Sequence, residues 1–435
     1  MSGYQNAVDY LERIGVFGSQ LGLTRILALL AELDHPETKF KSIHVTGTNG
    51  KGSTSAMLAS IAHAAGLKTG LYTSPHLQFY NERIQINGLP ISPDDFGAAV
   101  EQVRIAADKL VRAGLEQPTQ FEVLTAAAFL HFDALQVDLA IVEVGLGGLL
   151  DSTNVITPLC SVITNVALEH ADRCGGTLEG VIEHKGGIIK LDAPVVTAAE
   201  GTARERLRAI AKEKRAAFYC VDESWRVTDI TVSSQGTQFC YQGFGQSKTY
   251  KLSLIGRHQA QNAGAAISAM RVTLPQLLQR QECIETAIER GLRETIWPGR
   301  MEPVPYHKNW WIDGAHNPHG AAVLRAALDT LYPEQSIVFV LGILADKDRR
   351  GILSSLVRHY DRVIVAPVRS ERAAAPQVIA QEICTDMPPV AVNKLSEALA
   401  LAEREKGVVC IAGSLYLIGE VRSLLWLDKG KEDTV

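Results

Sequence analysis

The fold is decided by residues 42–65, which read SIHVTGTNGKGSTSAMLASIAHAA. The apolar run Ser42–Val45 predicts a buried strand, and the segment Gly52–Ala65 predicts a helix. Between them lies a loop rich in glycine and threonine. A buried strand that enters a helix through such a loop predicts an α/β sheet whose helix N-terminus can bind phosphate.

This loop carries groups that suit a nucleotide. Its glycines let the backbone approach phosphates closely, Lys51 can reach the β- and γ-phosphates, and a hydroxyl of Ser53 or Thr54 can ligate Mg²⁺. The spacing departs from GxxxxGK[ST], because Val45 occupies the position of the first glycine and Gly52 follows the lysine. From the residues alone, a phosphate site and a simple strand-to-helix turn therefore both remain open.

The alternation of strand and helix continues on both sides of the loop. Further strands are predicted at 69–72, 139–144, 160–166 and 193–197, and helices at 4–13, 23–33, 94–113, 120–135 and 203–214. This order predicts a doubly wound parallel sheet. Around 226–255 the apolar period changes to two, which predicts a small antiparallel patch.

A second α/β domain is predicted after Trp297-Pro298-Gly299, where the alternation restarts and continues to the last predicted helix at 416–425. We therefore place the domains at 1–297 and 298–435. The expected fold class is α/β, with an N-terminal P-loop-type domain and a C-terminal Rossmann-like domain.

Composition excludes several classes of protein. Net charge is −5, so no global basic field attracts nucleic acid or an anionic membrane. No apolar run reaches the length of a membrane span, and residues 1–14 lack the apolar region of a secretory signal. The seven cysteines form no CxxC pair, which favours reduced thiols in a cytoplasmic protein.

A series of motifs resembles the folylpolyglutamate synthase and dihydrofolate synthase family of the Mur-ligase superfamily. They include HVTGTNGKGST (44–54), YTSPHLQFYNERIQING (72–88), VEVGLGG (142–148), DSTNVI (151–156), ITNVALEH (163–170), HKGGIIK (184–190), GRHQAQNAGAA (256–266), WPGRME (297–302), DGAHNP (313–318) and AGSLYLIGEVRSLL (412–425). They follow the family's order through nearly the whole chain.

The resemblance implies an ATP-dependent ligase that joins L-glutamate to the carboxylate of a folate, through an acyl phosphate. It implies ATP as cosubstrate and Mg²⁺ as cofactor, with 1–297 as the ATP-binding domain and 298–435 as the glutamate-ligase domain. The family is mostly monomeric, so we expect a monomer whose partners are ATP, L-glutamate and a folate or dihydropteroate.

The resemblance also implies a metal group and a modified lysine. Glu143 ends an apolar run, and with Ser53 and His170 it is expected to ligate Mg²⁺, which prefers oxygen ligands. Lys185 is expected to be catalytic in a form carbamylated by CO₂. Carbamylation requires the neutral amine, which burial favours.

For the nucleotide and glutamate, the resemblance points to residues from both predicted domains. The expected ATP contacts are Gly47, Thr48, Asn49, Gly50, Lys51, Gly52, Ser53, Asn262, Arg300 and Asp313. Lys51 and His316 are expected to be catalytic, and His316 and Ser414 to contact glutamate. Asp313 and Ser414 are also good helix caps or turn residues, and that alternative stays open.

On the folate side, the expected substrate residues are Ser74, His76, Arg83, Phe121 and Asp151. Five positions depart from the commonest family form: Leu149, Glu169, Cys174, His184 and Gly186. These departures leave open a related ligase that joins an amino acid to a non-folate carboxylate. Dihydropteroate as a second substrate is also left open.

Overall fold

The computed structural model describes residues 3–15, 21–168, 173–278 and 282–427. Contacts divide the chain into two compact units, which we describe separately. Unit 1 comprises 1–230, 238–252 and 259–295, and unit 2 comprises 231–237, 253–258 and 296–435.

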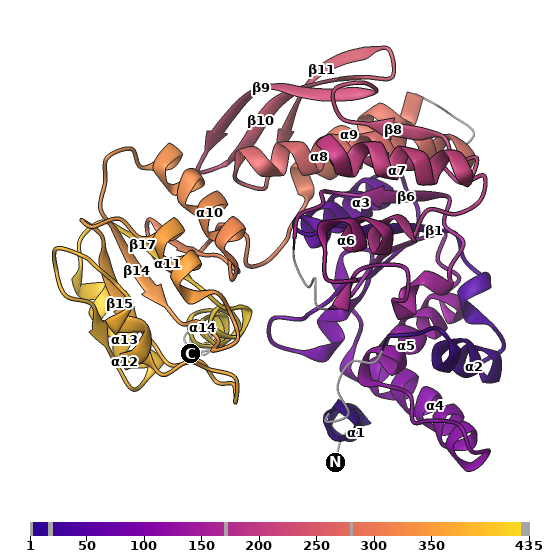
Figure 1. Ribbon diagram of the computed structural model, residues 1–435, viewed down its shortest axis with the longest axis horizontal. Helices are drawn as coiled ribbons and strands as arrows, with labels where there is room; N and C mark the ends of the chain where they lie inside the picture. Colours follow the sequence, from indigo (N-terminus) through magenta and orange to yellow (C-terminus); the bar gives the residue numbers. More distant parts are fainter. Residues whose placement is uncertain (1–2, 16–20, 169–172, 279–281, 428–435) are drawn as a thin grey trace, which may run out of the picture. The chain divides into compact units, whose positions relative to one another are not determined.

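Unit 1 is built on an eight-stranded sheet with the order β4-β3-β2-β5-β1-β6-β7-β8. Figure 1 labels three of these strands, β1, β6 and β8. Its strands are β1 (Ser42–Thr46), β2 (Thr69–Tyr72), β3 (Ile84–Ile86), β4 (Leu89–Pro90), β5 (Leu139–Glu143), β6 (Cys160–Ile163), β7 (Val195–Thr197) and β8 (Phe218–Cys220). Strand β1 is fully buried and pairs in parallel with β5 on one side and β6 on the other. The loops that follow these three strands therefore meet at one edge of the sheet, where doubly wound folds bind ligands.

Helices cover the sheet of unit 1. They are α1 (Gly3–Gly15), α2 (Thr24–Glu32), α3 (Lys51–Ala64), α4 (Pro93–Arg112), α5 (Gln120–Ala134), α6 (Leu178–Gly186), α7 (Gly201–Glu213), α8 (Arg257–Thr273) and α9 (Glu282–Glu294), with short 3₁₀ turns η1 (Pro36–Thr38), η2 (Tyr80–Arg83), η3 (Ser152–Val155) and η5 (Leu274–Gln276). One core joins α1, α2, α4 and α5 to residues of β2 and β5, and another joins α6 and α7 to β6 and β7. Helix α1 shows why: its buried residues Ala7, Tyr10, Leu11 and Ile14 recur every three to four positions and form one apolar face.

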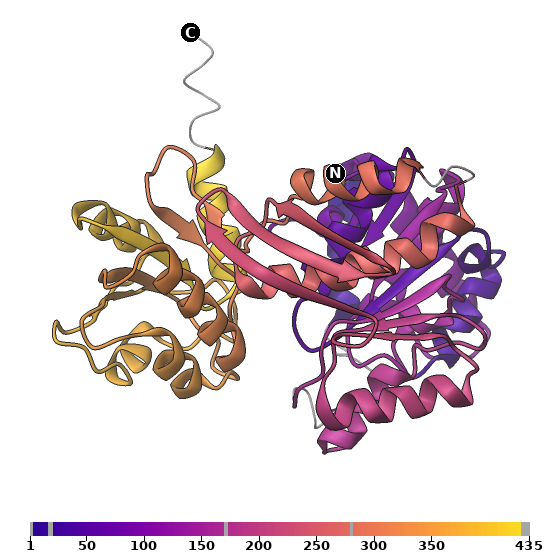
Figure 2. The same ribbon diagram turned by 90° about the horizontal axis from the view of Figure 1, so that it is seen from above.

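The predicted antiparallel patch is present as a three-stranded sheet in the order β11-β10-β9. Its strands are β9 (Trp225–Ser233), β10 (Gly236–Gly243) and β11 (Gln246–Leu252), which Figure 2 shows running alongside one another. On β9 exposed and more buried residues largely alternate, as a half-buried strand requires.

Unit 2 contains a six-stranded sheet in the order β12-β13-β17-β14-β15-β16. Its strands are β12 (Glu302–Pro303), β13 (Trp310–Ile312), β14 (Ile337–Leu341), β15 (Arg362–Val365), β16 (Val390–Ala391) and β17 (Val408–Ala412), and its helices are α10 (Pro318–Leu331), α11 (Arg349–Leu356), α12 (Pro376–Gln381), α13 (Leu395–Arg404) and α14 (Leu415–Leu427). All strand pairs except β12–β13 are parallel. The predicted α/β class, with parallel sheets in both halves of the chain, is confirmed.

Candidate active site

The loop after β1 has a conformation that depends on glycine. Gly47 and Gly50 have φ angles of +156° and +82°. A Cβ on Gly47 would lie 1.8 Å from Thr164 Oγ1, and one on Gly50 would lie 2.5 Å from Asn262 Oδ1. Both positions therefore exclude a side chain, and the second brings Asn262 against the loop.

The end of β6 holds this loop in place. The N–H groups of Thr48 and Asn49 donate to the backbone and side-chain oxygens of Asn165, at 3.0 and 2.9 Å. Thr164 Oγ1 donates to the Asn49 carbonyl at 2.6 Å. The predicted strand 160–166 ends at Ile163 because the residues that follow bind the loop. With two loop N–H groups used in this way, the backbone N–H groups in the first turn of α3 are the ones whose position suits an anion.

Lys51 is the first residue of α3, and its ammonium lies over the loop. Nζ donates to the carbonyl oxygens of Gly47 and Thr48, at 3.0 and 3.3 Å. Two carbonyl contacts neutralise an ammonium less completely than a carboxylate would, so the charge remains suited to phosphate oxygens.

A chain of side chains joins the first turn of α3 to α8. Gln259 Nε2 donates to Ser53 Oγ at 3.3 Å, and Asn262 Nδ2 donates to Gln259 Oε1 at 3.0 Å. Asn262 lies in the second turn of α8. Gln259 was missed by the sequence analysis, although it stands inside the quoted HQAQN segment.

The expected metal group is described only in part. Glu143 ends β5, is 4% exposed, and accepts the Ser74 N–H at 3.3 Å. A buried carboxylate and the Ser53 hydroxyl are hard oxygen ligands, so the donor chemistry fits Mg²⁺. His170 and Glu169 lie outside the described residues. Within the described ranges, no group of three or more His, Cys, Asp and Glu side chains could hold a metal by itself.

Lys185 lies in the last turn of α6 and is only 6% exposed. The Lys185 side chain is therefore not a solvated surface charge. Beside it, burial and the charge of Lys185 lower the pKa of His184.

A pocket of about 280 Å³ opens in unit 1 next to the loop after β5. Of the five expected folate residues, four line it: Ser74, Arg83, Phe121 and Asp151. The other lining residues are Pro75 and Ser152, which adjoin expected folate residues in the quoted motifs, and five that the sequence analysis did not find: Leu21, Thr119, Gly145, Leu146 and Leu150.

His76 does not line the pocket and instead supports a residue that does. Arg83 Nε donates to His76 Nδ1 at 2.9 Å, and the His76 and Tyr80 rings lie 4.4 Å apart. Burial, with the nearby Arg83 charge, lowers the pKa of His76 to about 3. The imidazole is therefore neutral and can accept this hydrogen bond.

Phe121 forms one wall of the pocket through close packing on a glycine. A Cβ on Gly145 would lie 2.5 Å from the Phe121 ring, and Phe121 stacks on Tyr72 with centroids 6.1 Å apart. The glycine after β5 is thus required for the ring to approach the loop.

Asp151 organises the same loop. It is 3% exposed and accepts the N–H groups of Leu146 and Thr153, at 2.8 and 3.0 Å. Burial raises its pKa, and these hydrogen bonds oppose the effect.

In unit 2, Asp313 follows β13 and holds the WPGRME segment. Its carboxylate accepts the N–H groups of Met301 and Ala315, both at 2.8 Å, and burial raises its pKa against the opposing charge of Arg300. Arg300 Nη1 donates to the Gly299 carbonyl at 2.9 Å. The turn alternative for Asp313 is therefore real, and a contact with nucleotide stays a prediction.

His316 and Ser414 lie on loops that meet, because Gly413 N–H donates to the Ala315 carbonyl at 3.1 Å. His316 Nδ1 lies 2.7 Å from the Gly314 carbonyl, so Nδ1 carries a proton. Ser414 Oγ accepts the Tyr416 N–H at 3.2 Å near the start of α14, which is the cap role left open above.

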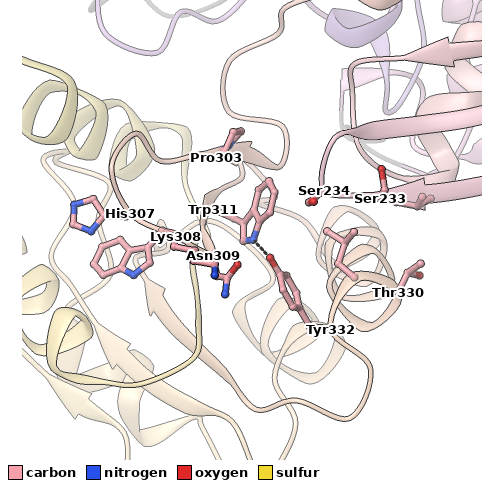
Figure 3. A pocket seen from close by; sticks show the side chains of 12 residues that line it. Ser233, Ser234, Pro303, His307, Lys308, Asn309, Trp311, Thr330 and Tyr332 are labelled. Carbon is pink, nitrogen blue, oxygen red and sulfur yellow. Dashed lines mark hydrogen bonds between the residues drawn. The ribbon is translucent and has the colours of Figure 1, made fainter.

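Unit 2 also contains a larger pocket, of about 510 Å³ (Figure 3). Its lining includes the residues that precede and begin β13, and Trp311 Nε1 donates to Tyr332 Oη at 2.9 Å. Asp313 follows the other end of that strand. None of the predicted ligand residues of unit 2 lines this pocket.

Cys174 and His184, two of the residues that depart from the common family form, both lie against the loop after β5. A Cβ on Gly147 would lie 3.1 Å from both Cys174 Sγ and His184 Nδ1. Leu149 is 42% exposed, and its N–H donates to the His184 carbonyl at 2.7 Å. Gly186 faces Ile210 Cδ1 of α7, at 2.5 Å from an added Cβ. Its lack of a side chain therefore lets α6 approach α7 closely.

No helix within the described ranges is long and apolar enough to cross a membrane.

Comparison with known proteins identifies the family. The model for the Mur ligase middle domain matches residues 45–270, and that for the dihydrofolate synthetase C-terminal domain matches 302–425. The chain is 35% identical to the dihydrofolate synthase/folylpolyglutamate synthase of Bacillus subtilis, covering 98% of this chain and 99% of that one. Among solved structures, it resembles Mycobacterium tuberculosis folylpolyglutamate synthase complexed with ADP, with TM-score 0.87, 32% identity and coverage of 98% and 99%. It also resembles Escherichia coli FolC in complex with DHPP and ADP, with TM-score 0.83, 27% identity and coverage of 96% and 97%. The chain therefore belongs to the folylpolyglutamate synthase/dihydrofolate synthase family.

Proposed function

We propose that the protein is an ATP-dependent ligase that joins the amine of L-glutamate to the carboxylate of a folate. The observation that carries this function is a hydrogen bond in unit 1 that joins the strand before the phosphate loop to the loop that borders the pocket. Thr46, next to the phosphate loop, donates from Oγ1 to the carbonyl of Gly147 at 2.8 Å, and Gly147 belongs to the loop that borders the pocket. A phosphate site and an organic pocket at one sheet edge suit phosphoryl transfer to a bound acid.

The chemistry follows from the weakness of a carboxylate as an electrophile. A carboxylate oxygen attacks the γ-phosphorus of ATP, ADP leaves, and an acyl phosphate forms. The glutamate amine then attacks the acyl carbon, loses a proton, and displaces inorganic phosphate. In this proposal Lys51 and the first-turn N–H groups of α3 neutralise charge on the transferred phosphoryl group.

Mg²⁺ bound through Glu143 and Ser53 would supply further neutralisation of phosphate charge. We assign His170 to the same metal group from the family resemblance. From the same resemblance, we assign Asn262, Arg300 and Asp313 to ATP, and His316 and Ser414 to glutamate. The division into an ATP-binding part (1–297) and a glutamate-ligase part (298–435), a monomeric state and a cytoplasmic location belong to this proposal as well.

We also propose that Lys185 acts as its carbamate. Its burial favours the neutral amine, which attacks the carbon of CO₂ and loses a proton to give the carbamate. Intact-mass measurement in bicarbonate buffer should show the added mass of one CO₂, which Lys185→Met should lose together with most activity. Lys190→Met is the matched control, because Lys190 Nζ donates to the Asn154 carbonyl at 2.8 Å and has no assigned role in catalysis. An unmodified wild-type mass under these conditions would exclude the carbamate.

The substrate is tested by phosphate release from purified protein with ATP, Mg²⁺ and L-glutamate. We expect release to require a folate and to differ among dihydropteroate, tetrahydrofolate and folate. Release with dihydropteroate would add dihydrofolate synthase activity. ATP binding without phosphate release for any of the three compounds would instead favour the non-folate ligase. The structural reason to consider that ligase is that Cys174 and His184, which depart from the common family form, lie beside Gly147.

A further inference from the structure

A buried chain of hydrogen bonds runs from β1 to the pocket of unit 1. His44 Nε2 lies 2.9 Å from Thr153 Oγ1, and Thr153 Oγ1 in turn donates to Asp151 Oδ1. His44 and Thr153 are 0% exposed. No role has been assigned above to either His44 or Thr153.

The direction of these hydrogen bonds follows from their partners. Asp151 is an acceptor when ionised, so the single hydroxyl proton of Thr153 points to it. Thr153 Oγ1 must then accept from His44, which places the histidine proton on Nε2. The remaining nitrogen agrees with this tautomer, because His44 Nδ1 is buried without a hydrogen-bond partner and would there be a bare lone pair. Burial lowers the pKa of His44 to about 3, so the ring is neutral.

This series of hydrogen bonds ends at the loop that borders the pocket. Asp151 Oδ2 accepts the Leu146 N–H at 2.8 Å, and both residues line the pocket. Thr46 holds the same loop at Gly147. His44 and Thr46 are two residues apart on β1, so they lie on one face of the strand, and that face binds the loop at two points.

We propose that His44 and Thr153 are positioning residues for the acid-bearing substrate: they fix the Asp151 carboxylate, and through it the 145–148 loop, to the strand that carries the phosphate loop. This inference rests on the proposed function, because it takes the pocket as the site of the folate. Neither residue touches substrate in this account. Their effect is therefore expected on binding of the folate and not on binding of ATP.

The experiment compares Thr153→Val, which removes the hydroxyl at nearly constant shape, with Thr153→Ser, which retains it. We expect Thr153→Val to raise KM for the folate about tenfold, since a buried acceptor loses a hydrogen bond. KM for ATP should change less than about twofold, and Thr153→Ser should remain near wild type. Thermal unfolding of both variants provides the check on folding.

A second pair of variants tests His44, at the other end of this series of hydrogen bonds. His44→Gln can donate from its amide nitrogen, whereas His44→Leu cannot, so only the leucine variant should behave as Thr153→Val does. Because both residues act on the same carboxylate, the double variant His44→Leu/Thr153→Val should be no worse than either single change. If a histidine variant does not fold, the threonine pair alone decides.

Three results would overturn the inference: equal KM for the folate in Thr153→Val and Thr153→Ser, an equal rise in KM for ATP, or full additivity in the double variant. Each of these leaves wild-type ligation intact. Absence of folate-dependent turnover in the wild-type protein would instead remove the proposed function itself, so the two failures are distinguishable.

Discussion

Replacement of Lys51 by alanine is expected to lower kcat about a thousandfold while the protein remains folded. The ammonium lies over the phosphate loop, held by the carbonyls of Gly47 and Thr48. In a transferring phosphoryl group, negative charge spreads over oxygens that such a cation can contact, and loss of one preorganised charge typically costs this order of magnitude. Phosphate release with saturating ATP, Mg²⁺, glutamate and folate measures the effect.

The chain offers a matched control for this variant. Lys68 Nζ also donates to a backbone carbonyl, that of Leu135, at 3.0 Å, but it is exposed and belongs to no pocket or loop of the site. Lys68→Ala should therefore keep nearly full activity. Near-normal turnover of Lys51→Ala, with thermal unfolding unchanged, would contradict the assignment of the phosphate loop.

Most elements of the fold could be predicted from the sequence because their apolar patterns are local. The strand predicted at 139–144 is observed as β5, since the apolar run that begins at Leu139 can only be buried on both faces of a sheet. The edge strands β3 and β4 were not predicted. Strand β3 pairs with β2, and β4 pairs with β3 at the edge of the sheet. Only Ile84 is fully buried in β3, and β4 is exposed, so neither strand forms the buried apolar run by which strands were predicted.

The candidate site could be predicted where a motif stands on one loop, and not where it is assembled across the fold. The expected phosphate loop is continuous in sequence, so the family resemblance could single it out although the glycine spacing left a simple turn open. Gln259 contacts Ser53 only because α8 packs near α3, and Leu146 enters the pocket because Asp151 binds its N–H. His44 is a further example: in sequence it is one polar residue in a buried strand, and its partner Thr153 lies 109 residues away.

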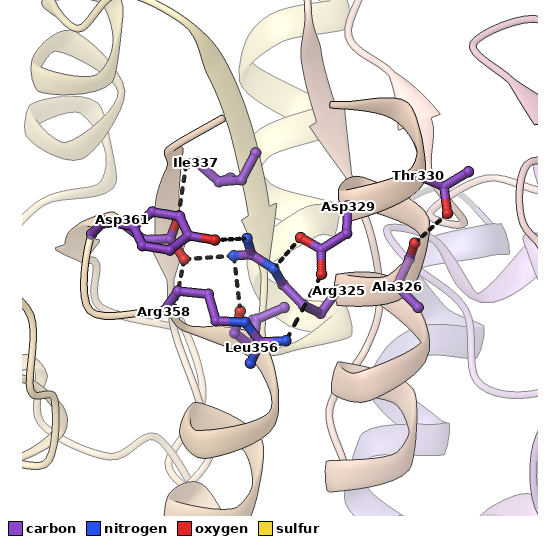
Figure 4. Close-up of polar contacts among 9 residues, drawn as sticks. Arg325, Ala326, Asp329, Thr330, Ile337, Leu356, Arg358 and Asp361 are labelled. Carbon is purple, nitrogen blue, oxygen red and sulfur yellow. Dashed lines mark hydrogen bonds and ion pairs between the residues drawn. The ribbon is translucent and has the colours of Figure 1, made fainter. Parts of the chain in front are cut away.

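The second large effect is expected on stability, at a buried ion pair in unit 2 (Figure 4). Arg325 of α10 and Asp361, before β15, pair at 2.5 Å with side chains 2% and 0% exposed. Arg325→Met should lower the free energy of unfolding of unit 2 by about 3–5 kcal/mol, because it leaves a buried carboxylate without its cation. Urea unfolding, monitored through hydrogen exchange of the β14 amides, measures this decrease in the free energy of unfolding of unit 2.

The control removes the exposed half of the same network. Asp329 accepts from Arg325 Nε at 2.7 Å, but its side chain is 44% exposed, so Asp329→Asn should cost less than about 1 kcal/mol. Equal losses for Arg325→Met and Asp329→Asn would show that burial of the pair is not what matters.

A double variant separates two reasons for keeping a buried ion pair. Replacing both members of such a pair by apolar residues is often neutral, because no uncompensated charge remains. Asp361 also accepts hydrogen bonds from the backbone N–H groups of Ile337 and Arg358, at 2.8 and 2.7 Å. Arg325→Met/Asp361→Leu would leave these two backbone donors without their acceptor. We therefore expect no recovery relative to Arg325→Met, and recovery to wild-type stability would show that the ion pair, and not the backbone anchoring by Asp361, dominates at this position.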